Sequence, residues 1–313
     1  QVFIGAGAGG ATTSGQYNTA IGRRALQNAT TATQNVAIGF HAMGDTPAGV
    51  VVSSCIAIGY NAFDASGQTT GANGTIAIGY EAGSAITSGA GNLAVGYQAG
   101  KALTSGQHNI AIGYAALQTH TTGDKNIAIG YNAMRDSGVG GSNSSNSVSN
   151  VFIGYGAGSG VWANNDSNHN IGIGTQVLQS ALNGVGGNIA MGLSALQECT
   201  DGNHNISLGY WTGKAITTGD NNVLASRVAG TSLTTGDDNI MLGAYAGDAA
   251  TTASGSVFIG VQAGSTLVTG NNNIGIGREA LGGGITTGDN NIAIGNAAGD
   301  ALTSGYNNVL MGK

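Results

Sequence analysis

Hydrophobic residues in this 313-residue chain occur in short alternating runs that return at a nearly fixed interval. The segment Asn109–Gly130 reads NIAIGYAALQTHTTGDKNIAIG, so it begins and ends with the same five residues. The last glycine of this motif recurs at Gly5, Gly22, Gly39, Gly59, Gly79, Gly96, Gly113, Gly130, Gly154, Gly174, Gly192, Gly209, Gly243, Gly260, Gly277, Gly295 and Gly312, and Ser226 replaces it in one more copy. Most intervals are 17 residues and the others are 18, 20 or 24. The pattern therefore predicts a single repeat array over residues 1–313.

Each repeat follows the consensus N-[IV]-A-[ILM]-G-Y-x-A-[GL]-x-A-[IL]-T-[TS]-G-x-x. Its two apolar stretches alternate with a period of two, which predicts two short strands, and T-[TS]-G followed by polar residues is a turn signal. Glycine at fixed, closely spaced positions disfavours a helix. We therefore predict an all-β fold, a parallel β-solenoid (β-roll) of about 18 coils with one 17-residue repeat per coil.

Stacking the coils places equivalent residues in columns. Asparagine precedes the strand in most copies, as at Asn109, Asn126, Asn150, Asn188 and Asn205. A column of amides can hydrogen-bond along the stack as a ladder, and a polar binding track is the alternative. Tyrosine follows the motif glycine in six consecutive copies that include Tyr97, Tyr114 and Tyr131. Ring-on-ring packing explains this column, and a sugar-stacking surface is the alternative.

The strand motif also bears on the oligomeric state. In NIAIG the two branched residues point to one face, yet the residue between them is apolar too, as at Ala111, Phe152 and Met241. A strand that is apolar on both faces needs cover on both, and the coil interior covers only one. We therefore expect a parallel homo-oligomer in which another copy of the chain covers the second face.

Composition excludes several classes of protein. Fifty-eight glycines with one proline, no Gly-X-Y period, 41% apolar and only 8% charged residues fit neither collagen nor a disordered chain. A net charge of −6 without a basic run predicts no nucleic-acid partner. No window approaches about 18 uninterrupted apolar residues, which predicts no membrane insertion. The two cysteines, Cys55 and Cys199, fall in repeat positions and are expected to be structural.

The repeat resembles two families. NVAIG at Asn35–Gly39 is similar to the head repeats of trimeric autotransporter adhesins, and Thr121–Met134, with the pattern TTGxxNxAIGxxA, looks still more like phage tail-fibre repeats that precede an endosialidase-type chaperone domain. The resemblance implies a left-handed homotrimer in the extracellular space, in a virion tail fibre or on a bacterial cell surface. Both ends lie within the repeat, so we expect a segment of a longer fibre.

Catalytic chemistry has no visible basis in the variable positions. They contain no paired carboxylates and no Ser-His-Asp grouping, so we expect no enzymatic activity and no cofactor. The Asp-containing turns lack the spacing of calcium-binding solenoid repeats. His108, His169 and His204 share one repeat position but lie in non-adjacent coils, so we expect no metal site.

Four intervals carry lengthened loops, at residues 44–54, 64–74, 136–149 and 160–169. Insertions on one face of a solenoid are often binding sites. In the fourth loop Trp162 stands among Asn164, Asn165 and Asp166, a ring with polar neighbours that suits a glycan.

Trp211 beside Tyr210 is the second candidate site. The sequence thus predicts a fibre segment that presents a host or surface glycan-binding site. A purely structural shaft or extracellular filament with tolerated loop variation is the alternative, and an ice-binding solenoid that uses the turn threonines is a minor one.

Overall fold

The structure is a computed structural model that describes residues 1–138, 146–163, 165–284 and 287–312. It comprises two compact units, Gln1–Asp166 and Ser167–Lys313, and the same coil builds both. The sequence repeat continues through both units.

Every coil contributes one three-residue strand. In the first unit the strands are β1 (Val2–Ile4), β2 (Thr19–Ile21), β3 (Val36–Ile38), β4 (Ile56–Ile58), β5 (Ile76–Ile78), β6 (Leu93–Val95), β7 (Ile110–Ile112), β8 (Ile127–Ile129) and β9 (Val151–Ile153). In the second unit they are β10 (Ile171–Ile173), β11 (Ile189–Met191), β12 (Ile206–Leu208), β13 (Val223–Ala225), β14 (Ile240–Leu242), β15 (Val257–Ile259), β16 (Ile274–Ile276), β17 (Ile292–Ile294) and β18 (Val309–Met311).

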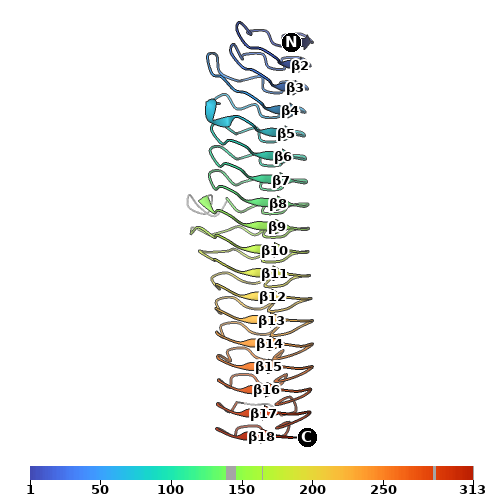
Figure 1. Cartoon of the computed structure of the whole chain (residues 1–313), viewed down its shortest axis with the longest axis vertical. Coiled ribbons are helices and arrows are strands. Elements are labelled where there is room, and N and C mark those ends of the chain that lie inside the picture. Colours follow the sequence, from blue (N-terminus) through green and yellow to red (C-terminus); the bar gives the residue numbers. More distant parts are fainter. Residues whose placement is uncertain (139–145, 164, 285–286, 313) are drawn as a thin grey trace. The chain divides into compact units, whose positions relative to one another are not determined.

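Within each unit successive strands pair in parallel and in register, so that Ile110 lies beside Ile127 and Ala111 beside Ala128 (Figure 1). The predicted all-β parallel β-solenoid with a repeat of about 17 residues is confirmed. Over the described ranges its helical content is limited to 3₁₀ conformation, at η1 (Thr70–Ala72) and at Asn146. That part of the chain therefore contains no helix that could cross a membrane.

The prediction of a second strand in each repeat is wrong. After the motif glycine the chain forms turns in which alternate residues adopt left-handed φ, as at Gln98 (φ 53) and Gly100 (φ 56). The amide of Gln98 donates to Tyr80 O of the preceding coil, and that of Gly100 donates to Ala116 O of the following coil. The segment therefore pairs its backbone with both neighbouring coils without being a strand.

The motif glycines are required by the spacing of the coils. Gly113 has φ 129, and a Cβ on it would lie 2.4 Å from the carbonyl oxygen of Gly130 in the next coil. An L-residue would therefore be strained and would also clash. This close approach explains why NIAIG ends in glycine.

The predicted asparagine ladder is present in both units. The backbone amide of Asn126 donates to Asn109 Oδ1 (2.9 Å), and its Nδ2 donates to the same oxygen (3.2 Å) and to Ser147 O (2.8 Å). Asn205 repeats this pattern with Asn188 in the second unit. The ladder asparagines Asn109, Asn126, Asn150, Asn188 and Asn205 are fully buried, so they form no binding track on the surface.

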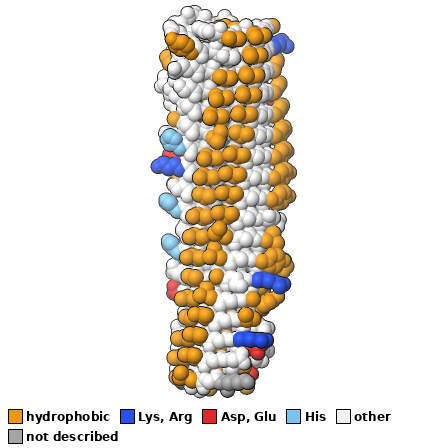
Figure 2. Space-filling view, turned by 45° about the vertical axis from the view of Figure 1, so that its right-hand side comes forward, with side chains coloured by type: hydrophobic (Ala, Val, Ile, Leu, Met, Phe, Trp, Pro, Cys, Tyr) orange, Lys and Arg blue, Asp and Glu red, His pale blue; other side chains and the backbone are white. Residues whose placement is uncertain are grey.

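The strand faces differ in burial. The middle residue of each internal strand points into the coil and is buried, whereas its two neighbours lie on the outer face and stay partly exposed. Figure 2 shows these outer hydrophobic side chains as long columns. Met191 and Ile294, for example, are 41% and 38% exposed. The outer face of the sheet is therefore an apolar surface in each unit.

Candidate functional site

The tyrosine column packs ring on ring. Tyr60, Tyr80, Tyr97, Tyr114, Tyr131 and Tyr155 stack with centroids 5.0–5.3 Å apart, and neighbouring planes lie within 10° of parallel. Their faces are turned toward one another, so a sugar cannot lie flat on them. The column contributes packing, as predicted, and the alternative of a sugar-stacking surface is wrong.

The fourth lengthened loop does not present the predicted ring. Trp162 is fully buried, with its indole Nε1–H donating to Gly158 O (3.2 Å) and its ring edge-on to Phe152 at 5.9 Å. Trp162 is therefore a core residue, and its proposed role in ligand stacking is wrong. Asn165 and Asp166 are exposed beside it. Asn164 and residues 139–145 of the third loop lie outside the described ranges.

The second candidate, Trp211 beside Tyr210, lies in a surface groove of the second unit. The two rings lie 4.8 Å apart at 25°, and both residues are about two-fifths exposed. The groove has a volume of about 570 Å³. It is lined by Glu198, Tyr210, Trp211, Lys214, Ala215, Arg227, Val228, Thr231, Ser232 and Tyr245.

Two cations line this groove together with the aromatic rings. Lys214 Nζ lies 5.1 Å from the Trp211 ring centroid, and Arg227 Cζ lies 5.4 Å from that of Tyr245. Glu198 is the single acidic lining residue, so the groove carries a net positive charge. Aromatic surface, hydroxyl groups and cations together suit a ligand with an apolar face and an anionic group.

Coil stacking brings these residues together. Trp211, Val228 and Tyr245 occupy the same position, two residues after the motif glycine or Ser226, in three consecutive coils. All three adopt left-handed φ, at 54°, 63° and 60°. The sequence pattern indicates Trp211 but not Lys214 or Arg227. The 17-residue spacing from Trp211 to Val228 and Tyr245 is the signal that places Tyr245 in the same column.

The turn threonines also bond between coils. The hydroxyl of Thr217 donates to Thr234 O (3.3 Å), and that of Thr234 donates to Thr251 O (2.9 Å). Each hydroxyl hydrogen is therefore used within the stack. This column stabilises the turns of the second unit.

Comparison with known proteins assigns no family, because no protein-family model matches the sequence and no curated protein matches it significantly.

Proposed function

We propose that this chain is a non-enzymatic segment of an extracellular fibre that associates with copies of itself through the outer face of its sheet. The observation that carries the proposal is the continuity of the outer apolar columns (Figure 2). At about 4.8 Å per strand, nine strands give each unit a strip about 40 Å long and roughly 400 Å² in area. Exposed apolar patches of this size on soluble proteins are commonly interaction sites.

A second copy of the chain is the occupant that fits best. The strip repeats with the period of the coil, so an identical strip matches it along its whole length. Three copies in parallel, in a left-handed form, is the arrangement implied by the resemblance to tail-fibre and adhesin repeats. A virion fibre or a bacterial surface structure is the setting that follows from it.

Charge placed on the strip tests this function. Ile259→Lys combined with Ile294→Lys puts two ammonium groups on partly exposed positions of β15 and β17. The methylene groups of each lysine can still pack against the neighbouring side chains of the column. We expect this variant to sediment as folded monomers. Thr218→Lys with Thr235→Lys adds the same charge on exposed turn positions and should leave the assembly intact. Equal masses for the two variants would reject the interface.

The groove around Trp211 favours a second, adhesive function. Its cations and exposed rings fit an acidic glycan, with the sugar against the exposed part of Trp211 and the anionic group near Lys214 or Arg227. Several copies in one fibre would raise the avidity of such a site. The alternatives of a shaft without its own ligand and of an ice-binding surface predict no saturable glycan binding.

A glycan array with the intact assembly tests this second function. Trp211→Gln removes the ring without straining the backbone, because Gln98, Gln176 and Gln262 occupy the same position with φ of 53–58°. We expect at least a tenfold loss of binding to carboxylated or sulfated glycans. Tyr306→Ser removes an exposed ring outside the groove and should change nothing. Binding that survives in Trp211→Gln would place the ligand elsewhere.

A further inference from the structure

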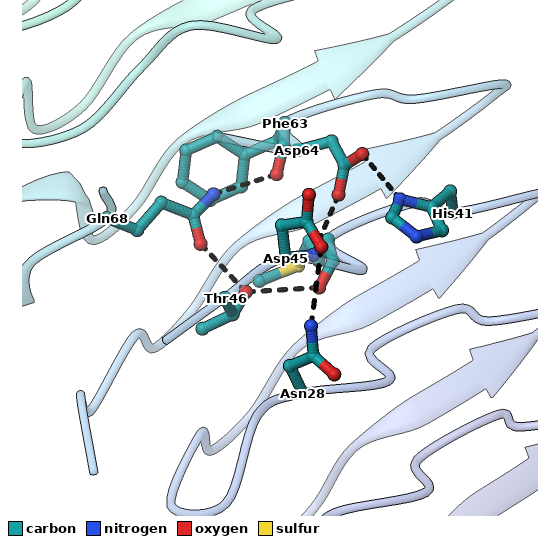
Figure 3. A network of polar contacts seen from close by, with 8 residues as sticks. Asn28, His41, Asp45, Thr46, Phe63, Asp64 and Gln68 are labelled. Carbon is teal, nitrogen blue, oxygen red and sulfur yellow. Dashed lines mark hydrogen bonds and ion pairs between the residues drawn. The ribbon is translucent and has the colours of Figure 1, made fainter. Parts of the chain in front are cut away.

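Three side chains with metal-binding groups converge where the first two lengthened loops begin. His41 and Asp45 follow β3, and Asp64 follows β4 in the next coil. Figure 3 shows the three side chains close together, with His41 turned toward Asp64. One ligand atom from each residue lies within 4.8 Å of the others. All three residues are partly buried.

The contacts of the cluster leave it rich in negative charge. His41 Nδ1 lies 2.7 Å from Asp64 Oδ2, and the backbone amide of Asp45 donates to Asp64 Oδ1 (2.9 Å). The side chain of Asp64 is only 8% exposed. Neither carboxylate pairs with a lysine or arginine in the described ranges.

Neighbouring bonds hold the two loops in place. Thr46 Oγ1 donates to Gln68 Oε1 (2.7 Å), and Gln68 Nε2 donates to Phe63 O (2.8 Å), which ties the loops together through buried side chains (Figure 3). Asn28 Nδ2 donates to Asp45 Oδ1 (3.3 Å). The loops and the Asp64 carboxylate are therefore positioned before any ligand binds, whereas the Asp45 carboxylate lies beside them, hydrogen-bonded to Asn28.

We propose that His41, Asp45 and Asp64 bind a divalent first-row transition ion, for which zinc is the best match. One imidazole nitrogen and two carboxylate oxygens are a donor set that zinc accepts, with water completing a tetrahedron. Calcium is a poor match because it takes six to eight oxygen ligands.

Ion binding requires only small adjustments of the side chains. Ligands at about 2.0–2.2 Å from one ion lie roughly 3–4 Å apart. The short contact between His41 and Asp64 must therefore lengthen slightly and Asp45 must turn inward. The ion takes the place of the hydrogen at His41 Nδ1, and the neutral imidazole then carries its hydrogen on Nε2.

Calorimetric titration of the whole chain with zinc chloride tests the site. We expect one saturable site per chain with a micromolar dissociation constant, weakened at least tenfold in His41→Asn and in Asp64→Asn. Asparagine suits the position of His41, because Asn61 and Asn132 occupy the same position in other coils with φ of 49° and 55°. His108→Asn removes an exposed histidine from another left-handed position and should bind zinc like the parent.

If one variant is unstable, thermal unfolding measured with and without zinc still tests the site. Zinc should raise the unfolding temperature of the parent and of His108→Asn but not of Asp64→Asn, and Asp45→Asn supplies a third variant. Absence of saturable zinc binding to the folded parent would overturn the site. Equal affinity in the parent and in the folded cluster variants would overturn it too.

Discussion

Phe258 and Gly264 share one space inside a coil of the second unit: a Cβ on Gly264 would lie 2.5 Å from the Phe258 ring. Phe258 is the middle residue of β15, and Gly264 is the fourth residue after the motif glycine of the same coil. In the coil of β7 the corresponding residues are Ala111 and Leu117, both fully buried. In each of these two coils a large side chain at one position accompanies a small one at the other, which keeps the interior filled.

This compensation predicts strong coupling between the two positions. Phe258→Ala should lower the free energy of unfolding by about 3–5 kcal/mol through a cavity, and Gly264→Leu should lower it by about 1–3 kcal/mol through overpacking. The double variant recreates the Ala111–Leu117 pair, and Leu117 shows that leucine tolerates this backbone, with φ 52. We expect the double variant to be more stable than Phe258→Ala in chemical denaturation. Additive losses would show that the pair is not coupled.

The asparagine ladder predicts a large loss of stability when Asn205 is replaced. Its side chain donates to Asn188 Oδ1 and Gly219 O, and its Oδ1 accepts from the amide and Nδ2 of Asn222. Asn205→Leu leaves these buried groups unpaired at about 1–3 kcal/mol each. Thermal unfolding should show a much lower midpoint than for the parent.

Asn296→Leu is the matched control for the ladder. Asn296 is exposed and follows the motif glycine, where other coils carry tyrosine. An apolar side chain therefore fits there, and we expect a change within about 0.5 kcal/mol. Similar midpoints for the two leucine variants would contradict a structural role for the ladder.

The burial of His120 predicts that the first unit loses stability in acid. Burial lowers the pKa of this imidazole to about 4, from 6.5 in a solvated chain. The unfolded chain thus binds the proton first as the pH falls, so the stability is complete above pH 6.5 and declines toward pH 4. The loss from this group is about 2–3 kcal/mol between pH 7.5 and 4.5.

A leucine variant isolates that contribution. His120→Leu matches Leu103, which occupies the same position one coil earlier and is buried. We expect urea unfolding of the variant to depend less on pH than that of the parent over this range. A parallel pH dependence in the two proteins would mean that His120 is not the group that titrates.

The repeat made the columns predictable, because the same position in stacked coils must pair with itself. The parallel sheet, the asparagine ladder and the tyrosine column all followed from that register. The second strand did not, because alternate left-handed residues such as Gln98 and Leu117 are set by hydrogen bonds between coils. The spacing of the apolar residues alone does not predict these left-handed residues.

Residues that do not recur from coil to coil were harder to place. Trp162 lies in a lengthened loop among polar residues, yet its ring turns inward and packs against Phe152. The groove at Trp211 depends on Tyr245, two coils further along the chain. His41 and Asp64 occupy the positions at which Gln98 and Gln118 make contact in regular coils, so coil stacking brings them together. No other coil carries histidine at the position of His41, so no column of repeated residues marked the cluster.

The oligomeric mass of the unmodified chain tests the proposed fibre function most directly. Sedimentation velocity and light scattering should be measured over a hundredfold range of protein concentration. We predict a defined assembly, with three times the chain mass of 30.6 kDa, that persists on dilution because the apolar strips are buried between copies. A soluble, folded monomer at every concentration would contradict the claim that the outer face of the sheet is an interface.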